Sequence, residues 1–389
     1  MKNIISRICG ALLICVGAAS CDSGESPEET GPPEVDYGGN ASSGMLTVLT
    51  WQDYIVPELV YQFSEDTGID VSVTEIENSD QMRQEIEASP GRFDVVIADD
   101  YSIQKLIAGH LLLPLEKDRI SNWKNLSEEF LGEYFDPDNA YSAPYSWGVV
   151  GIAYRKDRIS DPAPTWHLLW DESQRGRIGL LDEPVDLYNI ALLAGGVEPA
   201  EATEEQIVEA GERLFDCVER LGGKMDSFTA NLDKLVSGEL TLAVTYNSDC
   251  SLAMQENPEL GMVFPGEGLP SWVDSFAILR DSANYDAAHE FIDFMLEGTA
   301  AAATANDLRQ ATPNLAALPM IDEDLASDPT VFLPPELREI CSLSSFPKSG
   351  ELAVKKSTLE LFQRIRVAGH AQAGGESRPE DSQEVGRLK

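Results

Sequence analysis

Short apolar runs alternate with amphipathic segments along most of the chain. Between Leu46 and Val71, a β-branched run leads into the polar turn Trp51–Tyr54, and apolar residues at helical spacing follow. Pro57 suits the first turn of a helix, and Gly68 suits a left-handed cap at its end. The pattern predicts a strand, a turn, a helix and a second strand, with the turn just past the carboxyl end of the first strand.

The same alternation continues to about residue 280. The further apolar runs predicted to be strands are Phe93–Ala98, Trp147–Tyr154, Ile178–Leu181, Leu240–Tyr246 and Val273–Leu279. Thr203 and Gln206 match a capping box, and the helix after them carries Cys217 on its apolar face. This repeated order of strand and helix predicts an α/β fold with largely parallel sheets.

The two ends of the chain do not follow this pattern. A short basic region precedes an apolar run too short to span a bilayer, and small residues precede Cys21. We interpret residues 1–20 as a signal peptide and Cys21 as a lipidated N-terminus; the alternative is an ordinary secretory signal cut nearby. Residues 21–44 and 369–389 have too few large apolar residues to fold, so we expect a disordered tether and tail.

The formal net charge is −39. Such a charge argues against nucleic acid, whose binders need basic patches, and against anionic lipid surfaces. It is explained either by a solvated acidic coat or by a field that attracts cations. Because salt screens exposed charges over ~10 Å at 0.1 M, the total charge does not identify a ligand.

Motifs for cofactors and metals are missing from the sequence. It holds no CxxC, P-loop, GxGxxG or GxSxG, and its histidines lack the spacing of metal ligands. We therefore expect neither a cofactor nor a metal.

If the signal is removed and Cys21 is lipidated, then Cys217, Cys250 and Cys341 remain. A disulfide between Cys217 and Cys250 is one alternative, and three free or buried thiols are the favoured one.

Aromatic and acidic residues are paired near four predicted strand ends. The pairs are Trp51/Tyr54 with Asp53, Tyr101 with Asp99 and Asp100, Tyr246 with Asp249, and Trp272 with Asp274. The turn around Asp182, Glu183 and Asp186 adds a purely acidic corner. Aromatic faces suit methylene chains and attract ammonium groups, and carboxylates bind ammonium groups through charge-assisted hydrogen bonds. A cleft lined in this way suits a linear amine.

The chain resembles a known family at several stretches. TWQDYIVPELVYQF, FDVVIADDY, PYSWG, LLDEP, SWVDSFAI and TPNLAA occur in an order and spacing similar to the periplasmic spermidine/putrescine-binding proteins of polyamine ABC importers. The resemblance, which runs from about Leu46 to Arg366, implies a two-lobed, type II periplasmic binding fold that closes around a hinge. It implies one lobe made of residues 45–147 and 274–318, and a second made of 148–273 and 319–368.

Matched position by position, the resemblance implies a ligand site. Its members are Trp51, Asp53, Tyr54, Asp99, Tyr101, Glu183, Asp186, Tyr246, Asp249, Trp272, Asp274 and Gln310. Three of them depart from the family: Asp99 replaces Ser or Thr, Tyr246 replaces Trp, and Gln310 replaces a frequent aromatic. The family's last cleft residue falls near Ser345 or Phe346. These departures leave the length of the amine open.

The resemblance implies a lipid-anchored, monomeric solute-binding protein that captures a polyamine and delivers it to a membrane permease. No reaction is implied, because no nucleophile or metal accompanies the carboxylates. Alternatives are a polyamine sensor that docks on a membrane receptor, a hydrolase that uses two cleft carboxylates, and an acidic structural lipoprotein.

Overall fold

The computed structural model describes residues 45–343, 363–365 and 367–368. The predicted signal peptide, Cys21, the tether, the tail, Ser345 and Phe346 lie outside the described residues. None of the described helices is both long and apolar enough to cross a membrane.

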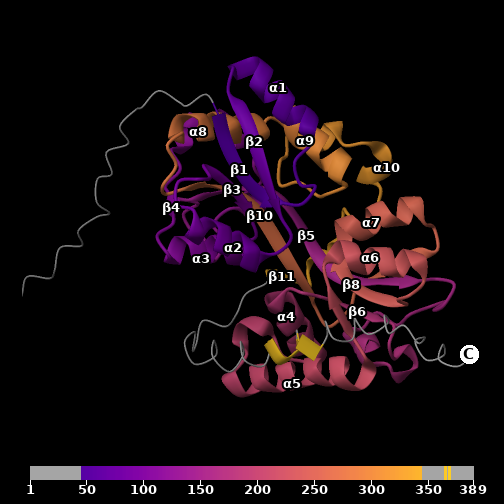
Figure 1. Ribbon diagram of the computed structural model, residues 1–389. Coiled ribbons are helices and arrows are strands. Elements are labelled where there is room, and N and C mark those ends of the chain that lie inside the picture. The colour runs from indigo at the N-terminus through magenta and orange to yellow at the C-terminus, as the bar shows by residue number, and fades with distance from the viewer. Residues whose placement is uncertain (1–44, 344–362, 366, 369–389) are drawn as a thin grey trace, which may run out of the picture. The chain divides into compact units, whose positions relative to one another are not determined.

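The described residues form mixed α/β structure (Figure 1). The strands are β1 (Met45–Trp51), β2 (Asp70–Ile76), β3 (Val95–Ala98), β4 (Leu112–Leu113), β5 (Ser142–Arg155), β6 (Ile178–Leu181), β7 (Lys224–Asp226), β8 (Leu242–Tyr246), β9 (Leu260–Val263), β10 (Leu269–Leu279) and β11 (Cys341–Leu343). The α-helices are α1 (Pro57–Thr67), α2 (Ser79–Ala88), α3 (Asp100–Ala108), α4 (Pro184–Ala194), α5 (Glu204–Leu221), α6 (Phe228–Ser237), α7 (Asn247–Glu256), α8 (Tyr285–Met295), α9 (Gly298–Leu308), α10 (Glu323–Ala326) and α11 (Pro335–Arg338).

Local signals in the sequence placed several element ends well. Gly68 caps α1 in the left-handed region, with φ 74°, and Thr203 and Gln206 make the reciprocal hydrogen bonds of a capping box at α5.

Cys217 and Cys250 are buried free thiols, and Cys341 is a partly exposed one. The structure therefore contains the three free thiols and not the Cys217–Cys250 disulfide.

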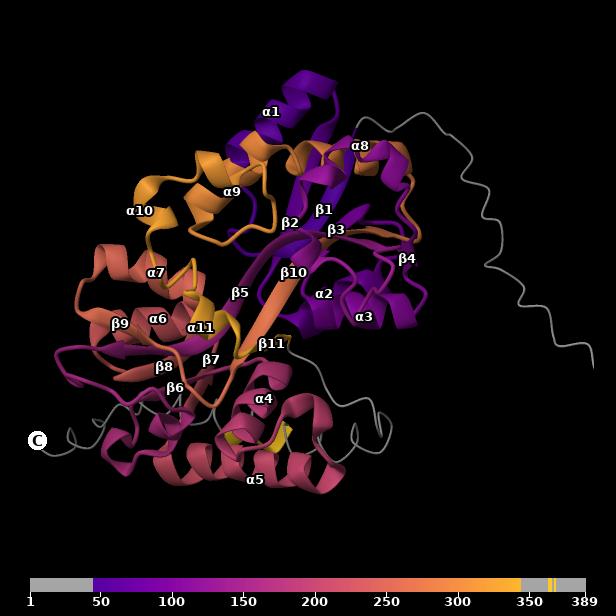
Figure 2. The ribbon, with the colours of Figure 1, turned by 180° about the vertical axis from the view of Figure 1, so that it is seen from behind.

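The strands are hydrogen-bonded in the order β2-β1-β3-β10-β5-β8-β6-β7. The long strands β5 and β10 run side by side between the group β1–β3 and the group β6–β8, as Figure 2 also shows from behind. Both were predicted too short, because prolines and polar residues near their N-terminal ends, such as Pro144, Ser146 and Pro270, interrupt the apolar pattern.

The prediction of largely parallel sheets is wrong for the middle of this arrangement. Strands β1, β2 and β3 are parallel, as are β6, β7 and β8, but β10 is antiparallel to β3 and β5, and β5 is antiparallel to β8. Since β5 carries the chain from one group to the other and β10 carries it back, the two neighbours must run in opposite directions.

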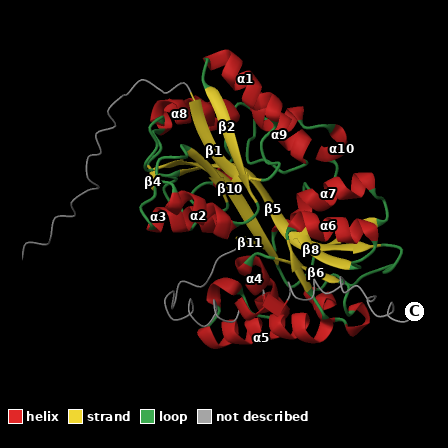
Figure 3. Ribbon diagram, viewed as in Figure 1, coloured by secondary structure: helices red, strands yellow, loops and turns green. Residues whose placement is uncertain are grey.

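Apolar residues pack on both faces of the group β1–β3. On one face Leu46 and Val48 contact α1 and α8, and on the other Leu49 and Val96 contact α2 and α3. Figure 3 shows the red helices on both sides of these yellow strands. Strands covered on both faces read as continuous apolar runs, which is why the sequence pattern revealed them.

A separate core lies around β6 and β8. It contains Leu181, Leu187, Leu214 and Val244, and therefore joins these strands to α4 and α5. The structure thus has distinct cores on either side of β5 and β10. The lobe boundaries at 147/148, 273/274 and 318/319 remain a prediction.

Candidate functional site

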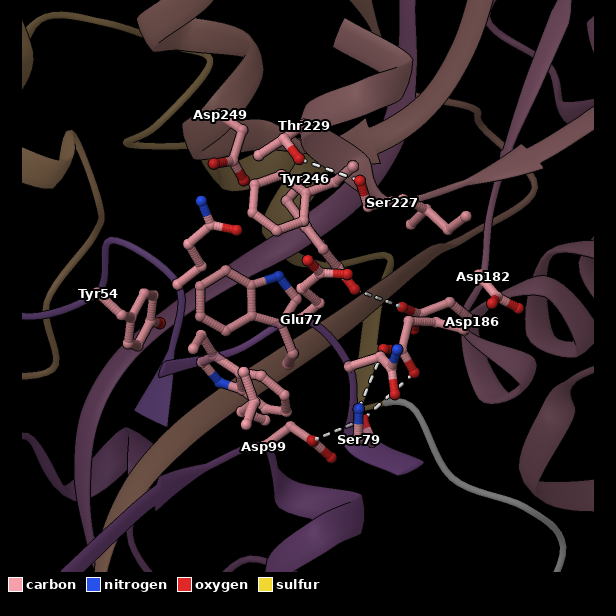
Figure 4. Close-up of a pocket in the computed structure, with 18 of the residues that line it drawn as sticks. Tyr54, Glu77, Ser79, Asp99, Asp182, Asp186, Ser227, Thr229, Tyr246 and Asp249 are labelled. Atoms are coloured by element: carbon pink, nitrogen blue, oxygen red, sulfur yellow. Dashed lines mark hydrogen bonds between the residues drawn. The ribbon is translucent and has the colours of Figure 1, made fainter. Parts of the chain in front are cut away.

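A cavity of ≈ 1370 Å³ lies where strand ends and helix N-termini from both cores meet (Figure 4). Its lining includes every residue that the sequence predicted for the site: Trp51, Asp53, Tyr54, Asp99, Tyr101, Glu183, Asp186, Tyr246, Asp249, Trp272, Asp274 and Gln310. The structure therefore brings the predicted residues together around one space.

Asp274 is one buried carboxylate of this cavity. Its side chain is 5% exposed and accepts a short hydrogen bond from the hydroxyl of Tyr54, whose own carbonyl accepts a bond of 3.1 Å from Tyr145. Burial raises the pKa of Asp274 to about 8, and the Tyr54 hydrogen bond opposes that rise. Without a cation, this carboxyl group is mostly protonated at neutral pH.

Trp272 forms an aromatic wall two residues before Asp274. It is 8% exposed, and its ring meets that of Tyr246 edge to face at 6.1 Å. Trp272 pairs with Gly148 on β5, where a Cβ atom would lie 2.5 Å from the indole. Glycine at 148 therefore lets the indole pack directly on the backbone of the neighbouring strand.

The acidic corner predicted from the sequence lies near Asp186, apart from Tyr54 in Figure 4. Glu183 and Asp186 of this corner lie at the start of α4, and Asp99 at the start of α3 joins them. Tyr246 donates a hydrogen bond to Asp186 at 3.2 Å. Burial raises the pKa of Asp99, and burial together with the charges of Asp186 and Asp99 raises the pKa of Glu183 well above its usual range. Such mutual repulsion is relieved by a bound cation.

Asp249 provides a further carboxylate in the first turn of α7. Burial raises its pKa to about 7. In Figure 4 it lies apart from both Tyr54 and Asp186, so carboxylates face the cavity from separate directions.

Other predicted members occupy less buried or more constrained positions. Asp53 lines the cavity but is exposed, and it adopts a left-handed backbone with φ 54°. The ring of Tyr101 is covered by the Lys105 ammonium, 4.7 Å from its centroid. Gln310 accepts a hydrogen bond of 2.8 Å from Ser146 on β5, which fixes its side chain beside the long strands.

Many of the cavity's carboxylates, though not Asp274 on β10, lie at the N-terminal ends of helices that begin beside the cavity. The helices are α2, α3, α4, α6 and α7, and Asp80, Asp99, Asp100, Glu183, Asp186, Asp226 and Asp249 lie at their first turns or just before them. A helix N-terminus carries roughly half a positive charge and stabilises a nearby anion. This explains how one cavity can hold so many acidic side chains.

Sequence reasoning missed part of the lining. Ser79, Ser227, Phe228 and Thr229 all line the cavity at the starts of α2 and α6. Their signal was the capping pattern: Asn78 caps α2 and Ser227 caps α6. Capping residues are common, so only the fold shows which caps face a cavity.

The site offers amines many acceptors and few competing charges. Among the described lining residues the cationic ones are Arg83 and Lys105. No group of His, Cys, Asp and Glu within the described ranges is arranged to hold a metal ion.

Comparison with known proteins assigns the family. The model for bacterial extracellular solute-binding proteins matches residues 58–333. The chain belongs to this family. It is a family of solute-binding proteins rather than of enzymes.

Relatives and solved structures give the comparison more detail. The spermidine/putrescine-binding periplasmic protein of Salmonella typhimurium is 29% identical over 289 residues, which are 74% of this chain and 82% of that protein. A putrescine/cadaverine-binding protein of Pseudomonas aeruginosa is 28% identical over 337 residues, or 83% of this chain and 90% of that protein.

Among solved structures, a Listeria monocytogenes protein assigned to a spermidine/putrescine ABC transporter has a TM-score of 0.76 and 28% identity, covering 83% of this chain and 99% of that one. A spermidine/putrescine ABC transporter substrate-binding protein from Streptococcus pneumoniae has a TM-score of 0.71 and 27% identity, covering 84% and 99%. These likenesses confirm the predicted α/β fold of a periplasmic binding protein and are consistent with its two-lobed, type II form.

Proposed function

We propose that this protein captures a linear polyamine outside the cytoplasm, in the periplasm, and delivers it to an ABC permease. The observation that carries the proposal is one cavity in which Asp274 lies beside Tyr54, whereas Asp99, Glu183 and Asp186 gather around Ser79 and Tyr246, which Figure 4 shows apart from Tyr54. An amine with a cationic group at each end can neutralise both places, while its methylenes contact Trp272 and Tyr246.

The names of the relatives support the same ligand class. The Salmonella and Pseudomonas proteins are named for spermidine, putrescine and cadaverine, which are all linear amines. We assign the carboxylates to binding the charge of the ligand, with the protein as a monomer whose lobes, as predicted above, close around it.

A direct test is calorimetric titration with putrescine, cadaverine, spermidine and spermine. At least one amine should bind, and it should raise the melting temperature because a ligand that binds only the folded state stabilises it. It should also reduce the radius of gyration, because a ligand that contacts both lobes favours the closed state. A wild-type protein that binds a neutral or anionic solute and no amine would overturn the proposal.

We also propose attachment to a bacterial membrane through a lipid on Cys21, which lies outside the described residues. The motivation is the run of small residues before this cysteine. Replacing Cys21 by serine should release the protein into the soluble fraction or block signal processing, because serine lacks the thiol that would carry the lipid. Mass spectrometry of the mature N-terminus checks this; an unlipidated N-terminus at another residue would contradict it.

A further inference from the structure

Ser79 connects the two sides of the cavity. It is the first residue of α2, whose Met82 and Ile86 pack in the core with β1 and β3. Its backbone N–H donates to Glu183 Oε1 at 3.4 Å, and its hydroxyl donates to Glu183 Oε2 at 3.2 Å. Glu183 is the N-cap of α4, which belongs to the other core, so this contact joins elements that pack separately.

The same hydroxyl also contacts Asp99. Ser79 Oγ lies 3.4 Å from Asp99 Oδ2, and the dashed lines of Figure 4 show Ser79 between Asp99 and a second carboxylate, which the hydrogen bonds identify as Glu183. A serine hydroxyl has one hydrogen, so it cannot donate fully to both carboxylates at once. The side chain therefore keeps two acidic groups close together without neutralising either.

The remaining hydrogen bonds fix the direction of Asp99. Ser102 donates to it twice, from its backbone N–H at 2.8 Å and from its hydroxyl at 2.7 Å. Asp99 is consequently held on the α3 side, and Glu183 reaches it only when α4 lies next to α2. The contact of both carboxylates with one hydroxyl, that of Ser79, thus depends on how close the two sides of the cavity are.

We propose that Ser79 is a positioning residue that sets Glu183 beside Asp99, so that one ammonium group of the ligand is shared between carboxylates from the two sides. The proposal rests on the proposed function. Closure then brings together two anions whose repulsion is costly in a buried site, and the ligand's cation removes that cost. Ser79 holds the two carboxylates near each other, and the ammonium group of the ligand neutralises their negative charge.

The test compares Ser79→Ala with wild type, with Ser79→Thr, which keeps the hydroxyl, and with Ser89→Ala at the opposite end of the same helix. Ser79→Ala should weaken binding of an amine such as putrescine roughly tenfold, chiefly through a faster dissociation rate, since a hydrogen bond to a charged group is lost. It should also reduce the ligand-induced fall in radius of gyration. Ser79→Thr should restore both, and Ser89→Ala should match wild type.

The outcomes separate this proposal from the function on which it rests. If wild type binds putrescine and Ser79→Ala matches Ser89→Ala in affinity, dissociation rate and scattering, the role of Ser79 is wrong and the proposed function stands. If Ser79→Thr binds the amine as weakly as Ser79→Ala, although both variants melt like wild type without ligand, the hydroxyl is not what positions Glu183 beside Asp99. If wild type binds no amine, both the proposed function and the proposed role of Ser79 are wrong.

Discussion

Replacing Asp274 by asparagine should weaken polyamine binding by roughly 30-fold or more. Asp274 is 5% exposed and faces the cavity beside Trp272 and Tyr54. Removing one member of a buried charge pair leaves the other uncompensated, at roughly 2–5 kcal/mol, and each 1.4 kcal/mol is about tenfold in affinity. Calorimetry at about pH 8.5, where most of the wild-type carboxyl is ionised, measures the full effect.

The matched control is Asp322→Asn. Asp322 is exposed and precedes α10, away from the cavity lining. The same chemical change there should leave the affinity for every amine nearly unaltered. Equal affinities for Asp274→Asn and Asp322→Asn would show that Asp274 is not part of the amine site.

Amine binding should release protons and strengthen as pH rises. The pKa of Asp274 is about 8 and that of Asp249 about 7 in the ligand-free cavity, both raised mainly by burial, and a bound ammonium group lowers them. At pH 7 binding should thus release about one proton from Asp274, visible as a dependence of the calorimetric enthalpy on the buffer's ionisation enthalpy. Affinity should fall roughly 100-fold between pH 9 and pH 6 from this group alone.

The Asp274→Asn variant provides the control for this titration, because its affinity should depend much less on pH.

The melting temperature of the ligand-free protein tests the raised pKa values independently. A carboxyl group whose pKa is raised in the folded state stabilises the protein below its unfolded pKa and loses that contribution as pH rises through its folded pKa. The ligand-free protein should therefore melt at progressively lower temperature as pH rises from about 4 to about 8, as far as these two groups, Asp274 and Asp249, are concerned. An affinity independent of pH between 6 and 9 would contradict the assignment.

All the predicted site residues except Gln310, which only the family resemblance implied, could be found because each belongs to a local pattern. Trp51 and Tyr54 follow the apolar run of β1, and Asp99 follows β3, so their positions relative to those strands could be read from the sequence. Glu183 and Asp186 follow β6 in the same way. A fold in which strand ends meet then brings them together.

What could not be predicted depends on contacts between distant segments. Ser79 lies at an ordinary helix start, and its contact with Glu183 spans 104 positions. Likewise, the antiparallel pairing of β5 with β10 depends on which way the chain crosses between cores, and the apolar pattern of a strand carries no direction. Local periodicity specifies the elements, and the long-range contacts follow from packing.

The helices that point their N-termini at the cavity have a consequence for how such a site could change its ligand. These helix ends favour anions, and the cavity suits cations only because acidic side chains outweigh the backbone there. Exchanging a few of those side chains for serine or threonine would leave the backbone unchanged and expose donor groups suited to a carboxylate or phosphate. The same scaffold could thus move between solutes of opposite charge through a small number of substitutions, without any new fold.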